Sequence, residues 1–126
     1  MSDLPMSLRT AATEQAYQNA KIAGTTQPLE LVDSIKIFEH WRIINNDFPY
    51  DVGYKRCHLL VIKRAECASW HDLHDEEIAE LNKLKREYLY DEYDQIIENC
   101  PSRRSVPHLF HLHLINFYDK REDMQL

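Results

Sequence analysis

The sequence of 126 residues contains only two glycines, Gly24 and Gly53. Glycine-rich phosphate loops, of the dinucleotide-binding and P-loop types, need closely spaced glycines so that the backbone can approach the phosphate. Neither loop type can be built from two isolated glycines. If this chain binds a phosphate group, it does so in another way.

Further absences narrow the class of protein. A net charge of -6, from 15 basic and 21 acidic residues, does not favour strong general binding to nucleic acid or to anionic membranes. No apolar run approaches the roughly 20 residues that cross a bilayer, and the N-terminus lacks a basic and then apolar leader. The three cysteines, Cys57, Cys67 and Cys100, form no CxxC pair, which argues against a disulfide framework or a cysteine zinc site. We therefore expect a soluble cytoplasmic protein with reduced thiols.

What is present fits one globular domain with an N-terminal extension. Hydrophobic residues make up 44% and charged residues 29% of the chain, close to the average of soluble domains. Residues 8–22 lack proline and glycine and predict a helix, with Ser7 as its N-cap and Gly24 as its end. A short polar linker follows. We therefore expect a helical arm over residues 1–34 and the domain proper over residues 35–126.

The domain proper mixes strand and helix patterns. Residues 35–38 and 41–44 are β-branched and aromatic runs that predict a hairpin, and the apolar run 57–62 predicts a central strand covered on both faces. Apolar residues at helical spacing predict the main helix over residues 75–90, and residues 93–99 are interpreted as a short strand. The expected fold class is α+β, an antiparallel sheet with a main helix and an extra N-terminal helix.

Histidines recur in the last strand pattern, residues 106–117. The second half of this segment alternates residue by residue, so His111 and His113 are expected on one face of a strand and their apolar neighbours on the other. His108 has the wrong parity unless a bulge intervenes. Two such imidazoles can bind a metal, or one can attack phosphorus while the other contacts a phosphate oxygen. A solvated histidine pair without a function is the third interpretation that the spacing leaves open.

A polar turn precedes the histidines. Arg103 and Arg104 supply two cations and Ser105 a small hydroxyl donor, groups that suit a phosphate better than a metal ion. The motif holds no acidic ligand, so no metal residues are assigned and a zinc or iron site is the weaker alternative. Its ligands would be His58, His108, His111 and His113.

Residues 105–115, reading Ser-Val-Pro-His-Leu-Phe-His-Leu-His-Leu-Ile, resemble the signature strand of the histidine-triad (HIT) superfamily. In that strand three histidines alternate with apolar residues after a Ser-Val or Ile-Pro lead-in. Residues 41–51 and 58–64 are similar to the family's Pro-Tyr turn and its His-x-Leu-Val-Ile-Pro-Lys strand, and residues 72–77 to its Leu-Ser/Thr-x-x-Glu helix start. The resemblance covers roughly residues 35–117 and leaves the N-terminal arm unexplained.

The resemblance implies a HIT-like domain, usually a homodimer, that binds a small-molecule nucleotide. Its implied activity is that of a nucleotide hydrolase or nucleotidyl transferase acting at the α-phosphate through a nucleotidyl-histidine intermediate, such as a phosphoramidase or a dinucleoside polyphosphate hydrolase. No cofactor is obligatory, although a divalent metal can accompany the nucleotide. By position in the motif the nucleophile is His111 and the third histidine is His113. The substrate contacts implied by the same match are His58, Asn99 and Ser105.

An aromatic turn adds two candidate contacts. Phe48 and Tyr50 flank a proline, and an aromatic turn of this kind can line a pocket for a flat base. Anchoring of the turn to the core is the alternative interpretation. Both residues are retained as substrate-binding candidates, together with Arg103 and Arg104.

The histidine motif departs from the family's pattern at its first position. In the ungapped register that position is Leu109, and His108 takes its place only through a one-residue insertion or bulge. Two functions follow. The chain is either a hydrolase or transferase that uses His111, with His113 and His108 beside it, or a catalytically weak or inactive HIT-like module that binds a nucleotide or a protein.

Overall fold

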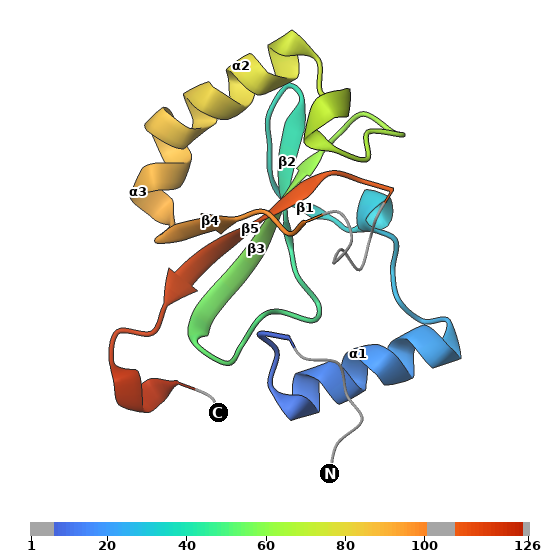
Figure 1. The fold of residues 1–126 in the computed structure, drawn as a ribbon, viewed down its shortest axis with the longest axis vertical. Helices are drawn as coiled ribbons and strands as arrows, with labels where there is room; N and C mark the ends of the chain where they lie inside the picture. Colours follow the sequence, from blue (N-terminus) through green and yellow to red (C-terminus); the bar gives the residue numbers. More distant parts are fainter. Residues whose placement is uncertain (1–6, 101–107, 125–126) are drawn as a thin grey trace.

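The computed structural model describes residues 7–100 and 108–124, and it has an α+β architecture (Figure 1). One five-stranded antiparallel sheet, in the order β1-β2-β3-β5-β4, forms its centre. Its strands are β1 (Ser34–Ile37), β2 (Trp41–Asn45), β3 (Tyr54–Ile62), β4 (Gln95–Ile97) and β5 (His111–Phe117). The helices are α1 (Ala11–Ala23), α2 (Asp75–Leu84), a π-helical turn (Lys85–Leu89), α3 (Tyr90–Glu92) and short 3-10 turns at Leu29–Leu31, Trp70–Asp72 and Arg121–Asp123. The fold class expected from the sequence is confirmed.

The main helix runs from α2 through the π-helical turn into α3, and it starts at the predicted residue. Glu77 accepts a hydrogen bond from the backbone N–H of His74 at 2.6 Å, which completes a capping box at the N-terminus. The buried Glu77 carboxylate also receives two hydrogen bonds from Arg64, each of 3.0 Å. The hydrogen bonds from Arg64 outweigh burial and hold the pKa of Glu77 below its ordinary value.

The main helix covers one face of the sheet. The indole N–H of Trp41 in β2 donates to the backbone carbonyl of Glu77 at 2.9 Å, and Trp41 is fully buried. Leu60 and Leu112 lie opposite each other in β3 and β5 and belong to the same core cluster. Burial of these side chains against the helix provides most of the apolar stabilisation of this layer. β3 is central and largely buried, as its apolar run predicts.

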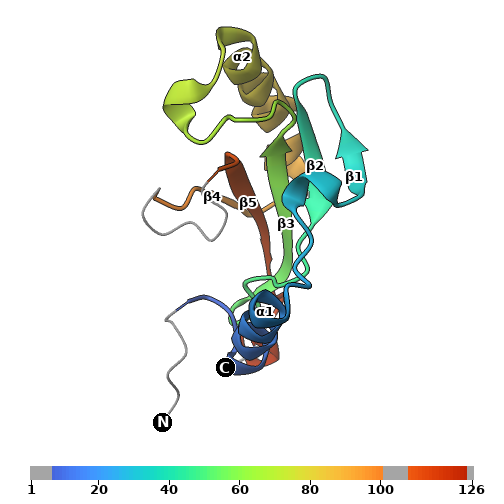
Figure 2. The ribbon, with the colours of Figure 1, turned by 90° about the vertical axis from the view of Figure 1, so that its right-hand side faces the viewer.

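The N-terminal arm begins its helix later than expected. Thr10 is the N-cap of α1, and its hydroxyl accepts from the backbone N–H of Thr13 at 3.3 Å; the Ser7 hydroxyl instead donates to Glu14 at 2.9 Å. The predicted end is confirmed, because Gly24 takes the left-handed conformation (φ 69°) that favours glycine at a helix C-terminus. Both views place α1 and α2 at opposite ends of the molecule (Figures 1 and 2). Of the helices described here, none has the length and apolar character that would let it cross a membrane.

Polar contacts dock the arm onto the loop between β2 and β3. Asp51 in this loop accepts hydrogen bonds from the Thr13 hydroxyl at 2.6 Å and from the backbone N–H of Thr10 at 2.7 Å. Arg9 donates from Nε to the backbone carbonyl of Phe48 at 2.7 Å. Burial acts to raise the pKa of Asp51, but the hydrogen bonds from Thr13 and Thr10 outweigh it and the pKa is lowered. Contacts therefore cross the boundary expected at residue 34.

Asp51→Ala is expected to loosen the arm, because it removes the acceptor that both threonines share. We expect the free energy of unfolding to fall by about 1–2 kcal/mol, and proteases to cleave within residues 8–24 faster. Urea unfolding and limited proteolysis measure the two effects. Asp119→Ala is the matched control, since that side chain is 83% exposed and contacts Lys55 only at 3.6 Å. Equal proteolysis of the two variants would contradict this account of the docking.

Candidate active site

The two strand histidines share one face of the sheet, as the alternation predicts. In the pairing of β3 with β5, His111 lies opposite Val61 and His113 lies opposite Leu59. Opposed residues of an antiparallel pair point to the same face. This face is not open to solvent, because His111 is only 6% and His113 only 4% exposed. A solvated histidine pair is therefore excluded.

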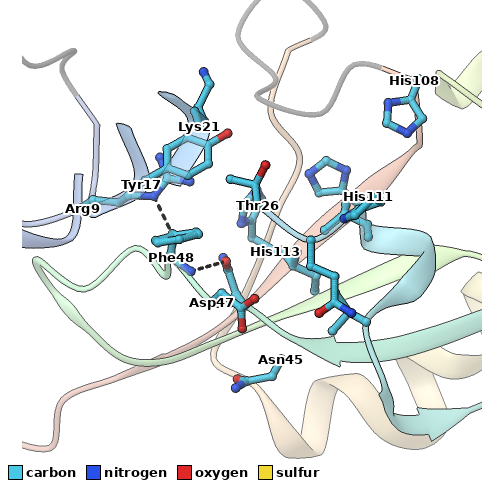
Figure 3. Close-up of a pocket in the computed structure, with 16 residues that line it drawn as sticks. Arg9, Tyr17, Lys21, Thr26, Asn45, Asp47, Phe48, His108, His111 and His113 are labelled. Atoms are coloured by element: carbon cyan, nitrogen blue, oxygen red, sulfur yellow. Dashed lines mark hydrogen bonds between the residues drawn. The ribbon is translucent and has the colours of Figure 1, made fainter. Parts of the chain in front are cut away.

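A pocket of about 310 Å³ lies between this face of the sheet and the N-terminal arm (Figure 3). Its walls come from segments far apart in the sequence. The arm contributes Arg9, Tyr17, Lys21, Thr26, Gln27, Pro28, Leu29 and Val32; residues 45–48 form a second wall; and Leu59, His108, His111 and His113 complete the lining. The arm, which the resemblance leaves unexplained, thus forms a large share of the site.

The ring of His111 has a fixed orientation. Its Nδ1 lies 2.8 Å from the backbone carbonyl oxygen of Leu109. A carbonyl only accepts hydrogen bonds, so Nδ1 carries the proton, and in the neutral ring the basic lone pair is on Nε2. The His111 ring meets the His113 ring edge-on, with centroids 5.5 Å apart. His111 thus has the tautomer that a nucleophile attacking through Nε2 requires.

His113 is held by three neighbours. Its ring stacks on Tyr50 with centroids 4.5 Å apart and planes 16° apart. The amide nitrogen of Asn99 lies 3.4 Å from its Nε2 and donates to the Tyr50 hydroxyl at 2.7 Å. On the other side of the ring, Nδ1 lies 3.9 Å from the Cys57 sulfur. Tyr50 and Asn99, expected to contact substrate, are not among the residues that line the pocket, and both contact His113.

His113 is a neutral group at neutral pH. Burial lowers its pKa, and the charges of His111 and Arg9 add to that effect, so that the pKa falls to about 3. Burial also raises the pKa of the neighbouring Cys57 thiol, against the hydrogen bonds of the backbone at Tyr50 and of Asn46. His113 can therefore contact an anion as a neutral hydrogen-bonding group and does not supply a positive charge.

His58 lies on the other face of the sheet. In the pairing of β3 with β5 it is opposite Leu114, one position out of phase with His113 and Leu59. Its Nδ1 lies 2.8 Å from the hydroxyl of Tyr93, which directly follows α3. Burial, followed by the charge of Arg56, lowers its pKa. His58 was expected at the site from its motif, but the structure does not bring it to the pocket.

His108 reaches the pocket from outside the strand. β5 begins at His111, and Leu109 is packed into the core with 2% exposure. His108 instead lines the rim of the pocket, where its Nε2 lies 2.6 Å from the Oε1 of Glu30, and its side chain is 63% exposed. His108 therefore lies in a turn that precedes the strand and is not part of the alternation of β5.

The remaining predicted residues divide into two groups. Phe48 lines the pocket as expected. Arg103, Arg104 and Ser105 lie outside the described residues. Within residues 7–100 and 108–124, no group of three or more histidine, cysteine, aspartate or glutamate side chains is arranged to hold a metal ion.

No residue of the arm was expected at the site from the sequence, and three of the arm residues that line the pocket bring a charge or an aromatic ring to it. The Tyr17 ring lies 5.1 Å from the Phe48 ring, and the Arg9 guanidinium lies 4.5 Å from the centroid of Tyr17 and 5.3 Å from that of Tyr50. The ammonium of Lys21 lies 5.2 Å from the Tyr17 centroid. The arm thus brings two cations to the histidine face. In the sequence, Tyr17 belongs to a rough stripe of apolar residues over the predicted helix 8–22, and this pattern does not identify what the helix packs against.

Comparison with known proteins shows a structural likeness. No protein-family model and no curated protein matches the chain. Among solved structures, the chain is similar to a histidine triad protein from Clostridium difficile, with 20% sequence identity and a TM-score of 0.44. The similarity covers 83% of this chain and 93% of that one.

Proposed function

We propose that the pocket binds a small-molecule nucleotide and that Nε2 of His111 attacks the α-phosphate. The product of that step is a nucleotidyl-histidine, which water or another acceptor then resolves, so the protein is a nucleotide hydrolase or nucleotidyl transferase. The observation that carries the proposal is the hydrogen bond from His111 Nδ1 to the carbonyl of Leu109. It sets the basic lone pair on Nε2, in a ring that lines the pocket.

The other lining groups support an anionic, aromatic substrate. Arg9 and Lys21 supply positive charge, and positive charge placed where negative charge develops stabilises the oxygens of a phosphorane-like transition state. The Tyr17 and Phe48 rings offer an apolar surface on which a base can pack. The volume of about 310 Å³ is at the lower end of the range found for small-molecule sites.

The proposal includes further expectations from the resemblance. It assigns no resident cofactor, and a divalent metal would enter with the phosphates of the substrate. A homodimer and a cytoplasmic location belong to the same proposal. Phosphoramidates and dinucleoside polyphosphates are the substrates to test first, since both contain a bond that is cleaved when an α-phosphate is attacked.

Detection of the covalent intermediate tests this function. Protein incubated with adenosine phosphoramidate or with a dinucleoside polyphosphate is denatured within the first turnovers and kept at alkaline pH, because a phosphoramidate bond is acid-labile. Mass spectrometry should find one nucleotidyl group per chain, and peptide mapping should place it on His111. Turnover without an adduct, or an adduct on another residue, would refute the proposal.

A second candidate function is binding without efficient catalysis. It is favoured by Leu109, which occupies the first triad position in the ungapped register and is packed into the core. In that case calorimetry would show nucleotide binding, while neither substrate class would be turned over and no adduct would form. The presence of a catalytic intermediate therefore separates the two functions.

A further inference from the structure

We propose that His108 and Glu30 form a catalytic dyad, in which His108 protonates the leaving group and then deprotonates the attacking water. The inference rests on the proposed function and adds a second catalytic residue to it, with Glu30 as a positioning residue. The starting observation is a contact of 2.6 Å between His108 Nε2 and Glu30 Oε1, across 78 positions of sequence. It joins the turn before β5 to the 3-10 turn of the arm.

The Glu30 carboxylate fixes the tautomer of His108. The pKa of Glu30 is lowered, first by its own backbone N–H and, against burial, by the hydrogen bond from His108, with the charges of His108 and Arg42 as further contributions. An ionised carboxylate only accepts, so Nε2 of His108 holds a proton and Nδ1 is the nitrogen that can exchange one. A carboxylate that orients a histidine in this way is a recurrent arrangement in catalytic sites.

The position of His108 suits proton transfer to the far side of the phosphate. When His111 attacks phosphorus in line, the leaving group departs opposite Nε2, and water later enters at that same position. His108 lines the same pocket as His111, and its ring stands apart from the His111 ring at the rim (Figure 3). Its exposed side chain can meet both a leaving group and water. One residue then serves as acid in the first step and as base in the second.

Bonds, electron pairs and protons are all accounted for over the two steps. In the first, the Nε2 lone pair of His111 forms the bond to phosphorus, the bond from phosphorus to the leaving group breaks, and imidazolium His108 gives its Nδ1 proton to that group. In the second, water attacks phosphorus and gives a proton to Nδ1 of His108. The P–N bond then returns its electron pair to Nε2, and His108 is again protonated.

Other groups in the pocket are less suited to this role. The pKa of about 3 leaves His113 neutral, so it does not donate as an imidazolium. Among the residues that the structure describes, the charged side chains that line the pocket beside the histidines are Arg9, Lys21 and Asp47, and Arg9 is already bonded to the Phe48 carbonyl. Imidazole is the side chain that both donates and accepts a proton near neutral pH.

Burst kinetics of His108→Asn test the dyad. Two substrates are compared: adenosine phosphoramidate, whose amine leaves only with a proton, and the p-nitrophenyl ester of adenosine monophosphate, whose phenolate leaves without one. We expect phosphoramidate turnover to fall by about a hundredfold or more. With the ester, we expect a burst of p-nitrophenolate of normal amplitude and then a slow steady state, with the nucleotidyl-protein accumulating. Glu30→Gln should show the same pattern more weakly.

A second histidine–glutamate pair, in which the histidine is half-buried, provides the control. His40 and Glu39 lie 3.7 Å apart in the turn between β1 and β2, outside the pocket, and His40→Asn should leave both phases unchanged. A variant that merely lost structure would lose burst amplitude and would not accumulate adduct. If the unaltered protein forms an adduct and His108→Asn discharges it at the same rate, the dyad is refuted. If the unaltered protein forms none with either substrate, the proposed function itself fails.

Discussion

His111→Asn is expected to lower turnover by roughly a thousandfold or more while the protein stays folded. The substitution removes the Nε2 that would form the covalent bond, and an asparagine amide can still donate to the Leu109 carbonyl that His111 contacts at 2.8 Å. Turnover of adenosine phosphoramidate, thermal unfolding and nucleotide calorimetry measure activity, fold and binding separately. Lost turnover with retained binding would assign chemistry to His111.

The matched control is His71→Asn, a histidine in the 3-10 turn Trp70–Asp72, outside the pocket lining. Its turnover should equal that of the unaltered chain. Full activity of His111→Asn would eliminate the covalent route through this residue. Loss of binding as well as turnover would show that the substitution reshapes the pocket, and the covalent adduct on the unaltered protein would then decide the mechanism.

The second large effect concerns stability at mildly acidic pH. The pKa of His113 falls from 6.5 to about 3 in the folded protein, chiefly through burial. Between these values the unfolded chain holds a proton that the folded chain does not, so stability is full above about pH 6.5 and declines as the pH falls. From about pH 7 to about pH 5 this one group should cost about 2 kcal/mol. Few carboxylates titrate in that window, so histidines dominate the change.

Urea unfolding of His113→Gln at several pH values measures this contribution. The variant should be less stable at neutral pH, because it loses the stacking on Tyr50, but its stability should fall less steeply with pH. His58, whose pKa is lowered by burial and by Arg56, contributes in the same direction and keeps part of the slope in the variant. Parallel pH profiles for the two proteins would mean that His113 is not buried as a neutral group.

The sequence predicts best where a pattern repeats along a single element. The alternation from His111 to Phe117 assigned both histidines to one face, and the apolar run 57–62 indicated a central strand; both are confirmed. The sequence did not predict which face of the sheet His58 occupies. That face depends on the register between β3 and β5, in which His58 pairs with Leu114. A motif match gives the order of residues along the chain, whereas a shift of one residue in register exchanges the two faces.

The position of the N-terminal arm was the larger feature that the sequence did not predict. Its position depends on the contacts of Thr10 and Thr13 with Asp51, which are about 40 residues away in sequence and carry no periodic signal. For the same reason Arg9 and Lys21 could not be assigned to the pocket in advance. The sequence correctly suggested that Tyr50 and Asn99 lie near the histidines. Residue types alone, however, do not separate a ligand contact from a side chain that supports His113.

The docking of the arm also affects how tightly the pocket binds its ligand. Since Arg9 and Lys21 line the pocket only while α1 is docked, the measured dissociation constant equals that of the docked form divided by the fraction of molecules in which the arm is docked. By linkage, a ligand that requires those side chains increases that fraction. A substitution at Asp51, which lies outside the pocket lining, therefore weakens binding through this population, and saturating ligand restores the complete pocket.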